Sequence, residues 1–301
     1  MKIGVVGAGP AGLSAAYELT AKGQEVTVFE HDPQFVGGIS RTVTYHGYRF
    51  DIGGHRFFSK NPEVEDFWSQ ILGDDLMTRS RMSRILYNGK FYDYPLKPLN
   101  AFRNMGVLNT LLCVIDAKAQ FAPPSDLRTF EDWVVRHFGR RLYTMFFKTY
   151  TEKVWGTPCN AISADWDAQR IKGLSLASAI KNAFRLQGHD DASAVIKTLV
   201  DEFRYPRLGP GMLWDQVVHE MMTMGGVLEM GSKVMGMLHH EGRARTIAFR
   251  HADGVMASYD VDHVVSSMPL RSLIRAMSPK PPGRVIRAAE ALQYRDSLRW
   301  R

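Results

Sequence analysis

Hydrophobic positions at the start of the chain follow a strand–helix–strand pattern. Lys2–Val6 is a short apolar run, which is typical of a buried parallel strand. A glycine-rich turn follows, and a helix is predicted from about Pro10 to Lys22. Gly23, a residue tolerant of positive φ, ends that helix. Gln24–Glu30 alternates and is β-branched, which predicts a second strand. The chain therefore opens on a predicted βαβ unit.

The pattern beyond this unit changes from hairpins to helices. Thr42–Ile52 has the pattern of a hairpin, and residues 84–94 have that of another around Asn88-Gly89, a strong turn signal. Residues 96–204 are predicted to be mostly helical, with apolar residues at helical spacing in Phe130–Phe147. This block has the pattern of an insertion with a hydrophobic core of its own.

The last third of the chain returns to short strands after Gly209-Pro210-Gly211. A helix is predicted over Met212–Met224, and a further helix begins within Val285–Gln293. The strands predicted between these helices are Val227–Met230, Lys233–His239, Thr246–Arg250, Val255–Tyr259 and His263–Ser267.

Composition and charge narrow the class of protein only a little. The 301 residues suggest roughly two domains at about 150 residues each, and 45% apolar with 23% charged residues is ordinary for a globular protein. The formal charge is 38 − 31 = +7, scattered apart from groups such as Arg79–Arg84 and Arg140–Arg141. This charge fits either a solvated face or attraction of an anionic ligand such as a pyrophosphate or a nucleotide sugar. No nucleic-acid-binding signature accompanies it.

The cysteines and the apolar runs bear on redox chemistry and location. Cys113 and Cys159 form neither a disulfide framework nor a metal-ligand spacing, so no metal site is expected. The first strand begins at Lys2 and leaves no room for a signal peptide. The longest apolar stretch, Val107–Ile115, is too short to span a bilayer. We expect a cytoplasmic protein without an integral membrane segment, with peripheral membrane contact left open.

The first glycine-rich turn carries the most specific signal. Gly7, Gly9 and Gly12 fit G-x-G-x-x-G, with Pro10 and Ala11 between the last two glycines. The motif follows a predicted strand and opens a predicted helix, as a dinucleotide-binding turn requires. The first glycine permits the tight turn, the second lets a pyrophosphate approach the backbone, and the third brings helix and strand close together. The N-terminus of the helix offers unpaired N–H groups to the phosphates.

An acidic residue at the end of the second strand completes this fingerprint. Glu30 lies 18 residues beyond Gly12. A carboxylate at this position can accept both ribose hydroxyls of an adenosine, and it would repel a 2′-phosphate, which argues against NADP here. The motif alone does not distinguish FAD from NAD.

The segment after Glu30 favours FAD by resemblance. Gly37, Gly38, Ser40 and Arg41 follow the acidic strand end closely. This stretch resembles the amine-oxidase-like flavoproteins, which include protoporphyrinogen oxidases and UDP-galactopyranose mutases. The resemblance implies that the glycine pair and the following basic residue lie against the FAD pyrophosphate, where Arg41 offers a charge-assisted fork. A surface arginine in a loop is the alternative.

Two further stretches extend the resemblance around the flavin. Gly53, Gly54 and His55 are similar to a family loop that runs beside the isoalloxazine ring. The resemblance therefore makes His55 a candidate catalytic residue near the flavin, with a hydrogen-bonded structural histidine as the alternative. Val234, in a segment that resembles the family's return to the first domain, would contact the adenine through its backbone.

The stretch Tyr150-Thr-Glu-Lys153-Val-Trp155 resembles a Tyr-x-x-Lys-x-Trp segment that lines the mutase substrate cleft. Arg170 falls where those enzymes place an Arg-Ile pair. Tyr150 and Trp155 can stack on a uracil or another ring, and Lys153 and Arg170 can pair with a diphosphate. We expect an anionic small-molecule substrate between His55 and this segment. Aromatic core packing with exposed basic residues is the alternative.

The resemblance covers nearly the whole chain and implies an α/β fold: a Rossmann-like FAD-binding domain with an inserted, mostly helical substrate domain. The expected boundaries are residues 1–83 for the first part of the FAD-binding domain, 84–205 for the substrate domain, 206–278 for the return segment, and 279–301 for the start of an incomplete segment.

Three functions follow from the resemblance. The first is an FAD-dependent oxidoreductase, with NAD(P)H as a candidate reductant. The second is a UDP-galactopyranose mutase-type isomerase that uses reduced FAD on a nucleotide sugar. The third is a catalytically incompetent fragment, because family members continue past the position of Pro269 with a Gly-Asp segment that covers the FAD. A truncated chain would be expected to hold flavin weakly.

Overall fold

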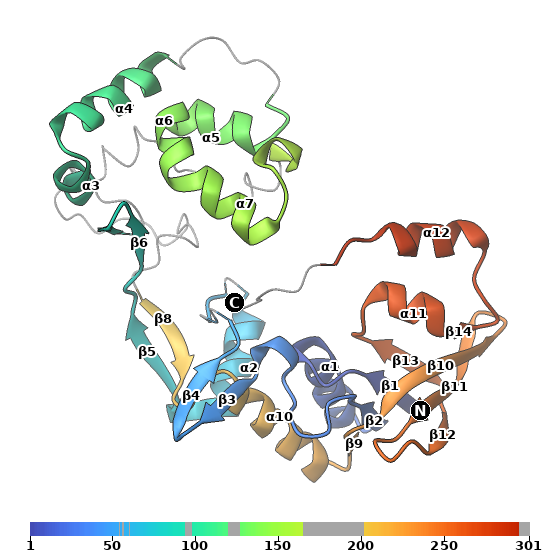
Figure 1. Ribbon diagram of the computed structural model, residues 1–301. Coiled ribbons are helices and arrows are strands. Elements are labelled where there is room, and N and C mark those ends of the chain that lie inside the picture. The colour runs from blue at the N-terminus through green and yellow to red at the C-terminus, as the bar shows by residue number, and fades with distance from the viewer. Residues whose placement is uncertain are drawn as a thin grey trace. The chain divides into compact units, whose positions relative to one another are not determined.

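The chain forms two units, which Figure 1 shows as ribbons in the computed structural model. Unit 1 comprises Met1–Arg79 and Arg204–Arg301, and unit 2 comprises Ser80–Phe203. The structure describes residues 1–53, 55, 57–59, 61–93, 98–119, 127–164 and 202–294.

Unit 1 is built on a parallel sheet of strand order β13-β1-β2-β9. Helix α1 (Pro10–Ala21) connects the two central strands, which confirms the predicted βαβ unit. The strands are β1 (Lys2–Val6), β2 (Glu25–Phe29), β9 (Val227–Glu229) and β13 (His263–Ser266). The two outer strands come from the last third of the chain, so the sheet joins segments that are far apart in sequence.

The two faces of this sheet pack against different layers. Ile3 and Val5 of β1 are buried in one core with Leu13 of α1 and Leu213 of α10 (Gly211–Thr223). Val6, the next residue along β1, is buried on the other side. Because successive side chains of a strand point into one core or the other, the sequence of each strand is a nearly continuous apolar run. Helix α2 (Pro62–Leu72) completes the helical layer.

A second, mostly antiparallel sheet of order β12-β11-β10-β14 packs on the opposite face of the parallel sheet. Phe29 of β2 contacts Phe249 of β11 with ring centroids 4.7 Å apart, and Ile247 is fully buried between the layers. A Cβ on Gly4 of β1 would strike Ile247, so this glycine lets the sheets approach. The strands are β10 (Lys233–His240), β11 (Arg243–Arg250), β12 (Met256–Asp260) and β14 (Met277–Ser278).

The first predicted hairpin is confirmed as β3 (Thr42–Tyr45) and β4 (Tyr48–Asp51). His46 and Gly47 both have positive φ at its turn, as a two-residue hairpin loop requires. A 3₁₀ turn, η1 (Gly38–Ser40), precedes it.

Several elements of unit 1 differ from the expectation or were not foreseen. The block 96–204 was expected to be mostly helical, which leaves room for the strand at its end: β8 (Glu202–Pro206) pairs with β5 (Leu76–Ser80) and was not foreseen. The pairing partner lies more than a hundred residues away, which a local pattern cannot reveal. The unforeseen η2 (Gly73–Asp75) follows α2, and α11 (Leu270–Ala276) precedes α12 (Gly283–Ala291).

Unit 2 has a hydrophobic core of its own. The hairpin β6 (Arg84–Tyr87) and β7 (Lys90–Asp93) turns at Asn88-Gly89 as predicted, and both turn residues have positive φ. Val134, Tyr143 and Cys159 are buried in this core. Burial raises the pKa of the Cys159 thiol, and neither cysteine is in a disulfide.

The helical elements of unit 2 pack around this core and begin with α3 and α4. Helix α5 starts at a capping box in which Thr129 and Asp132 satisfy each other's backbone N–H. The elements are α3 (Pro98–Met105), α4 (Val107–Ala119), α5 (Phe130–Phe138), α6 (Arg140–Leu142), the π-helix η3 (Tyr143–Lys148), α7 (Thr149–Trp155) and η4 (Cys159–Ala161). Within the described ranges, no helix has the length and hydropathy needed to cross a membrane.

Candidate nucleotide-binding site

The glycine-rich turn between β1 and α1 has the geometry of a phosphate-binding loop. Gly7 has φ +96° and donates its N–H to Phe29 O at 2.9 Å, which closes the turn. Gly9 is the N-cap of α1 in extended backbone, and a Cβ built on it meets no protein atom within 4 Å. A Cβ on Gly12 would overlap Gly7 O. The second glycine therefore faces open space, and the third permits the close approach of helix and strand. Pro10 and Ala11 form the first turn of the helix.

The glycine pair singled out by the resemblance lies against this turn. Gly37 donates its N–H to Ala8 O at 2.8 Å, and a Cβ on Gly38 would lie 3.3 Å from Gly9 Cα. Both glycines have positive φ, which suits residues without a side chain. The structure thus brings together two motifs that are almost thirty residues apart.

Glu30 is anchored to the same turn. Its Oε2 accepts the N–H of Ala8 at 2.6 Å, and its Oε1 accepts the N–H of Asp32 at 2.8 Å. A carboxylate has about four lone-pair sites, so each oxygen keeps a site for a further donor. Ser232 donates its N–H to Glu30 O at 2.7 Å, which places the start of β10 beside the end of β2. Val234, two residues on, is buried in β10.

Arg41 is held by an ion pair that the sequence pattern did not indicate. Its Nη1 lies 2.6 Å from Asp32 Oδ2, and its guanidinium lies over the Phe35 ring, 5.1 Å from the centroid. Asp32 Oδ1 accepts the N–H groups of Gln34 and Phe35, and these bonds together with Arg41 lower the pKa of Asp32. Arg41 Nε is buried and has no hydrogen-bond partner among the described residues. Contact of Arg41 with a pyrophosphate stays a prediction.

Residues of the loop from Gln34 to Thr42, of α10 and of the end of β9 border a cavity of about 430 Å³ in unit 1. Thr42 Oγ1 accepts the N–H of Gly211 at 3.0 Å, which ties the hairpin to α10. Trp214 packs beneath Gly37, whose built Cβ would lie 2.9 Å from Trp214 Cδ1. Thr42 and Trp214 were not singled out from the sequence, where Gly209-Pro210-Gly211 was the available signal. The cavity is lined by Gln34, Phe35, Val36, Arg41, Thr42, Gly211, Asp215, Val218, Leu228 and Met230.

Asp215 in this cavity gives a pH-dependent stability. Asp215 is an exposed residue, but nearby protein atoms still raise the pKa of its carboxyl by desolvation, so ionisation opposes folding by a small, solvent-screened amount. Asp215→Asn is expected to raise the melting temperature at pH 7. The gain should shrink as the pH falls through the raised pKa and vanish below the unfolded value of about 3.9. Thermal melts of both proteins from pH 7 to pH 4 measure this difference.

Asp32→Asn is the matched control of opposite sign. Because the pKa of Asp32 is lowered in the folded state, its ionised form stabilises the protein above about pH 3.9, and this contribution is lost as the pH falls through the folded value. The Asn variant should therefore melt lower than the parent at pH 7. A lower melting temperature of Asp215→Asn at pH 7 would contradict the assignment.

His55 lies in unit 1, with its N–H donated to Gly53 O at 3.0 Å. Its Nε2 is buried without a hydrogen-bond partner in the described part of the chain. No hydrogen bond between described residues links Gly53 or His55 to the phosphate turn, and Gly54 lies outside the described residues. The position of His55 near a flavin therefore stays a prediction.

The predicted substrate residues of unit 2 lie on α7. Tyr150 is 68% exposed and Trp155 is 41% exposed, so neither ring belongs to the hydrophobic core of the unit. Lys153 lies three residues after Tyr150, which puts both on the same side of the helix. Arg170 lies outside the described residues. Binding of substrate by these residues stays a prediction.

The fold and the turn define a dinucleotide-binding protein of the Rossmann class, and comparison with known proteins agrees. Residues 5–71 match the NAD(P)-binding Rossmann-like domain family. The chain is 28% identical over 210 residues to protoporphyrinogen oxidase 2, chloroplastic/mitochondrial, of Arabidopsis thaliana, covering 62% of this chain and 40% of that protein. It is 28% identical over 167 residues to a probable UDP-galactopyranose mutase of Klebsiella pneumoniae, covering 50% of this chain and 40% of that protein.

Solved structures show the same fold. The crystal structure of reduced UDP-galactopyranose mutase has a TM-score of 0.77 at 23% identity, covering 97% of this chain and 61% of that one. A putrescine oxidase structure has a TM-score of 0.59 at 18% identity. Together the matches place the chain in the superfamily of Rossmann-like flavoproteins that includes protoporphyrinogen oxidases and UDP-galactopyranose mutases. The chain spans about two fifths of the length of these curated relatives.

Proposed function

We propose that the turn Gly7–Gly12 binds FAD and that the protein is an FAD-dependent oxidoreductase. The observation that carries the proposal is the open space at Gly9, bordered by the Gly37-Gly38 loop and by the carboxylate of Glu30. A pyrophosphate at Gly9 would meet the unpaired N–H groups of the α1 N-terminus. Each oxygen of Glu30 has a site left for a ribose hydroxyl. The two curated relatives named above are of the two kinds counted earlier among the amine-oxidase-like flavoproteins, which favours FAD over NAD.

When bound, FAD supplies hydride transfer, and the chain's residues bind and orient it. Gly7 and Gly12 shape the turn, and Glu30 positions the adenosine end. Ser40 and Arg41 border the pyrophosphate side, and Val234 lies on the strand proposed to flank the adenine. His55 is the residue proposed nearest the reacting end.

A mutase-type isomerase is the second candidate. It is favoured by the Gly-Gly-His loop, by the exposed Tyr150, Lys153 and Trp155 on α7, and by the similarity to a probable UDP-galactopyranose mutase. In that case a nucleotide sugar is the proposed substrate, with its ring on the aromatic side chains and its diphosphate on Lys153 and Arg170.

A visible absorption spectrum of the purified protein, with and without added FAD, tests the cofactor. A flavin spectrum that persists through gel filtration would support the proposal, and its absence after FAD addition would contradict it. Oxygen-coupled NAD(P)H oxidation and conversion of UDP-galactopyranose then separate the two reactions. Binding of FAD with neither activity would favour the third, non-catalytic alternative.

Trp155→Ala is expected to weaken binding of a nucleotide substrate without affecting FAD. Loss of one stacked ring costs about 1–3 kcal/mol, so the Kd of UDP should rise about tenfold. Calorimetric titration with UDP and with FAD measures both. Val154→Ala, at a neighbouring exposed position, is the matched control and should change neither Kd. Equal UDP affinity of the Trp155→Ala protein and the parent would remove Trp155 from the substrate site.

A further inference from the structure

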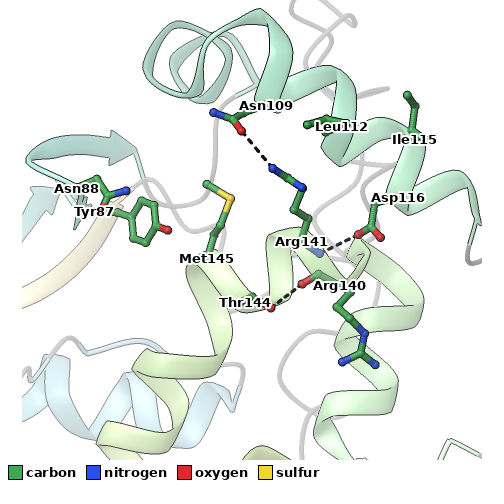
Figure 2. A pocket seen from close by; sticks show the side chains of 10 residues that line it. All are labelled: Tyr87, Asn88, Asn109, Leu112, Ile115, Asp116, Arg140, Arg141, Thr144 and Met145. Carbon is green, nitrogen blue, oxygen red and sulfur yellow. Dashed lines mark hydrogen bonds between the residues drawn. The ribbon is translucent and has the colours of Figure 1, made fainter.

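Unit 2 contains a cavity of about 750 Å³. It is lined by none of the residues discussed above for FAD or for substrate. Its volume falls within the range of roughly 300–1,000 Å³ that is usual for small-molecule sites. Figure 2 shows that its walls come from the β6–β7 turn, from α4, and from α6 with the following π-helix. The lining residues are Tyr87, Asn88, Asn109, Leu112, Ile115, Asp116, Arg140, Arg141, Thr144 and Met145.

Arg141 places a cation in this cavity without an acidic partner among the described residues. Its Nη2 donates only to the neutral Asn109 Oδ1, at a long 3.4 Å. The nearby Asp116 carboxylate instead accepts the backbone N–H of Arg141 at 2.7 Å (Figure 2). The guanidinium therefore keeps most of its donor fork for a ligand, while its main chain is held in place.

Arg140 lines the same cavity and is different in this respect. Its Nη1 lies 3.0 Å from Glu131 Oε1, so its charge is already paired. The two adjacent arginines thus offer a natural comparison, with one guanidinium occupied and the other available.

The remaining wall is mixed, with the polar residues Asn88, Asn109, Asp116 and Thr144 beside apolar ones. Tyr87, Leu112 and Met145 border the cavity in Figure 2. Tyr87 also packs on Phe146, with ring centroids 5.6 Å apart, so its ring is fixed. Met145 lies on the π-helix η3, and π-helical turns are frequent at functional sites. Apolar side chains beside one available guanidinium suit a ligand with an apolar body and one anionic end.

We propose that this cavity binds a small amphipathic anion, an aromatic phosphate or carboxylate. Its anionic end takes the fork of Arg141, in the bidentate manner typical of guanidinium with phosphate and carboxylate. Its ring lies against Tyr87, Leu112 and Met145. The site is independent of the FAD site in unit 1, so it does not require the proposed function to hold.

Calorimetric titration of the full chain with phenyl phosphate and benzoate tests this site, with inorganic phosphate and benzyl alcohol as probes of each half alone. We expect at least one of the two aromatic anions to bind more tightly than either half-probe. Arg141→Gln should weaken that binding about tenfold, whereas Arg140→Gln should change it less than about threefold. The stronger of the two aromatic anions identifies the headgroup as phosphate or carboxylate.

Thermal melts establish that the variants fold, and Arg141→Lys provides a second variant that keeps the charge without the fork. An intermediate affinity of Arg141→Lys supports bidentate recognition. Equal weakening by the Arg140 and Arg141 variants would overturn the proposal, as would aromatic anions that bind no better than benzyl alcohol or inorganic phosphate. If Arg141→Gln does not fold, full affinity in a folded Arg141→Lys would also overturn the bidentate contact.

Discussion

Replacement of Gly9 by valine is expected to abolish FAD binding while leaving the fold nearly as stable as in the parent. A Cβ at this position meets no protein atom within 4 Å, and the residue has extended backbone that valine adopts readily. The added side chain would occupy the space proposed for the pyrophosphate. We expect the Kd of FAD to rise at least about 100-fold, or about 2.8 kcal/mol. Loss of a favourable N-cap residue should lower the free energy of unfolding by only about 1 kcal/mol.

Calorimetric titration with FAD and chemical denaturation without FAD measure the two effects separately. Gly9→Ala should give an intermediate loss of affinity, because its side chain fills less of the same space. Undiminished FAD affinity in the valine variant would show that the pyrophosphate does not lie at this turn, and the proposed cofactor site would have to be abandoned.

Replacement of Gly12 by alanine is expected to act mainly on stability, whereas the valine at position 9 acts mainly on FAD affinity. Its Cβ would overlap Gly7 O, so β1 and α1 would have to separate. Overpacking costs about 1–3 kcal/mol, and overlap with a backbone atom puts this change at the upper end, whereas helix propensity alone would favour alanine by about 1 kcal/mol. We expect a net loss of about 2 kcal/mol, which lowers the melting temperature by roughly 4–8 °C.

Gly283→Ala is the control for this change. Gly283 is the first residue of α12 and has no positive φ, and a Cβ built on it would make only a van der Waals contact with Arg287 Nη1 at 3.5 Å. Differential scanning calorimetry should show no loss for Gly283→Ala. An unchanged melting temperature of Gly12→Ala would mean that the helix can shift freely, contrary to the packing described.

The local elements of both units could be predicted because their signals lie within short windows. The apolar run Lys2–Val6, the turn glycines and the hairpin loop at Asn88-Gly89 each specify a conformation by themselves. The pairing of β5 with β8 could not be predicted, because it depends on a partner more than a hundred residues away. The sheet to which each late strand belongs was undetermined for the same reason.

The candidate site was predictable to a similar extent. The family resemblance implied that Gly37 and Gly38 lie against a pyrophosphate, which stays a prediction. The structure adds that Gly37 donates its N–H to Ala8 O of the phosphate turn. The ion pair of Arg41 with Asp32 was not foreseen, because the two residues meet through the fold of the loop between them, which their separation in sequence does not reveal. Trp214 was also missed, since its contact with Gly37 joins two distant segments.

The strand order of the parallel sheet has a consequence for how this chain folds as it is synthesised. Strand β1 pairs with β2 within the first thirty residues, but its other neighbour includes His263, the partner of Ile3. Until those later residues leave the ribosome, one edge of β1 stays unpaired, and β2 likewise waits for Val227. Unpaired edges invite association with other chains, and such long-range contacts form slowly. Unit 2 emerges in this interval with a core of its own, so it can fold first and leave completion of the nucleotide-binding sheet as the late step.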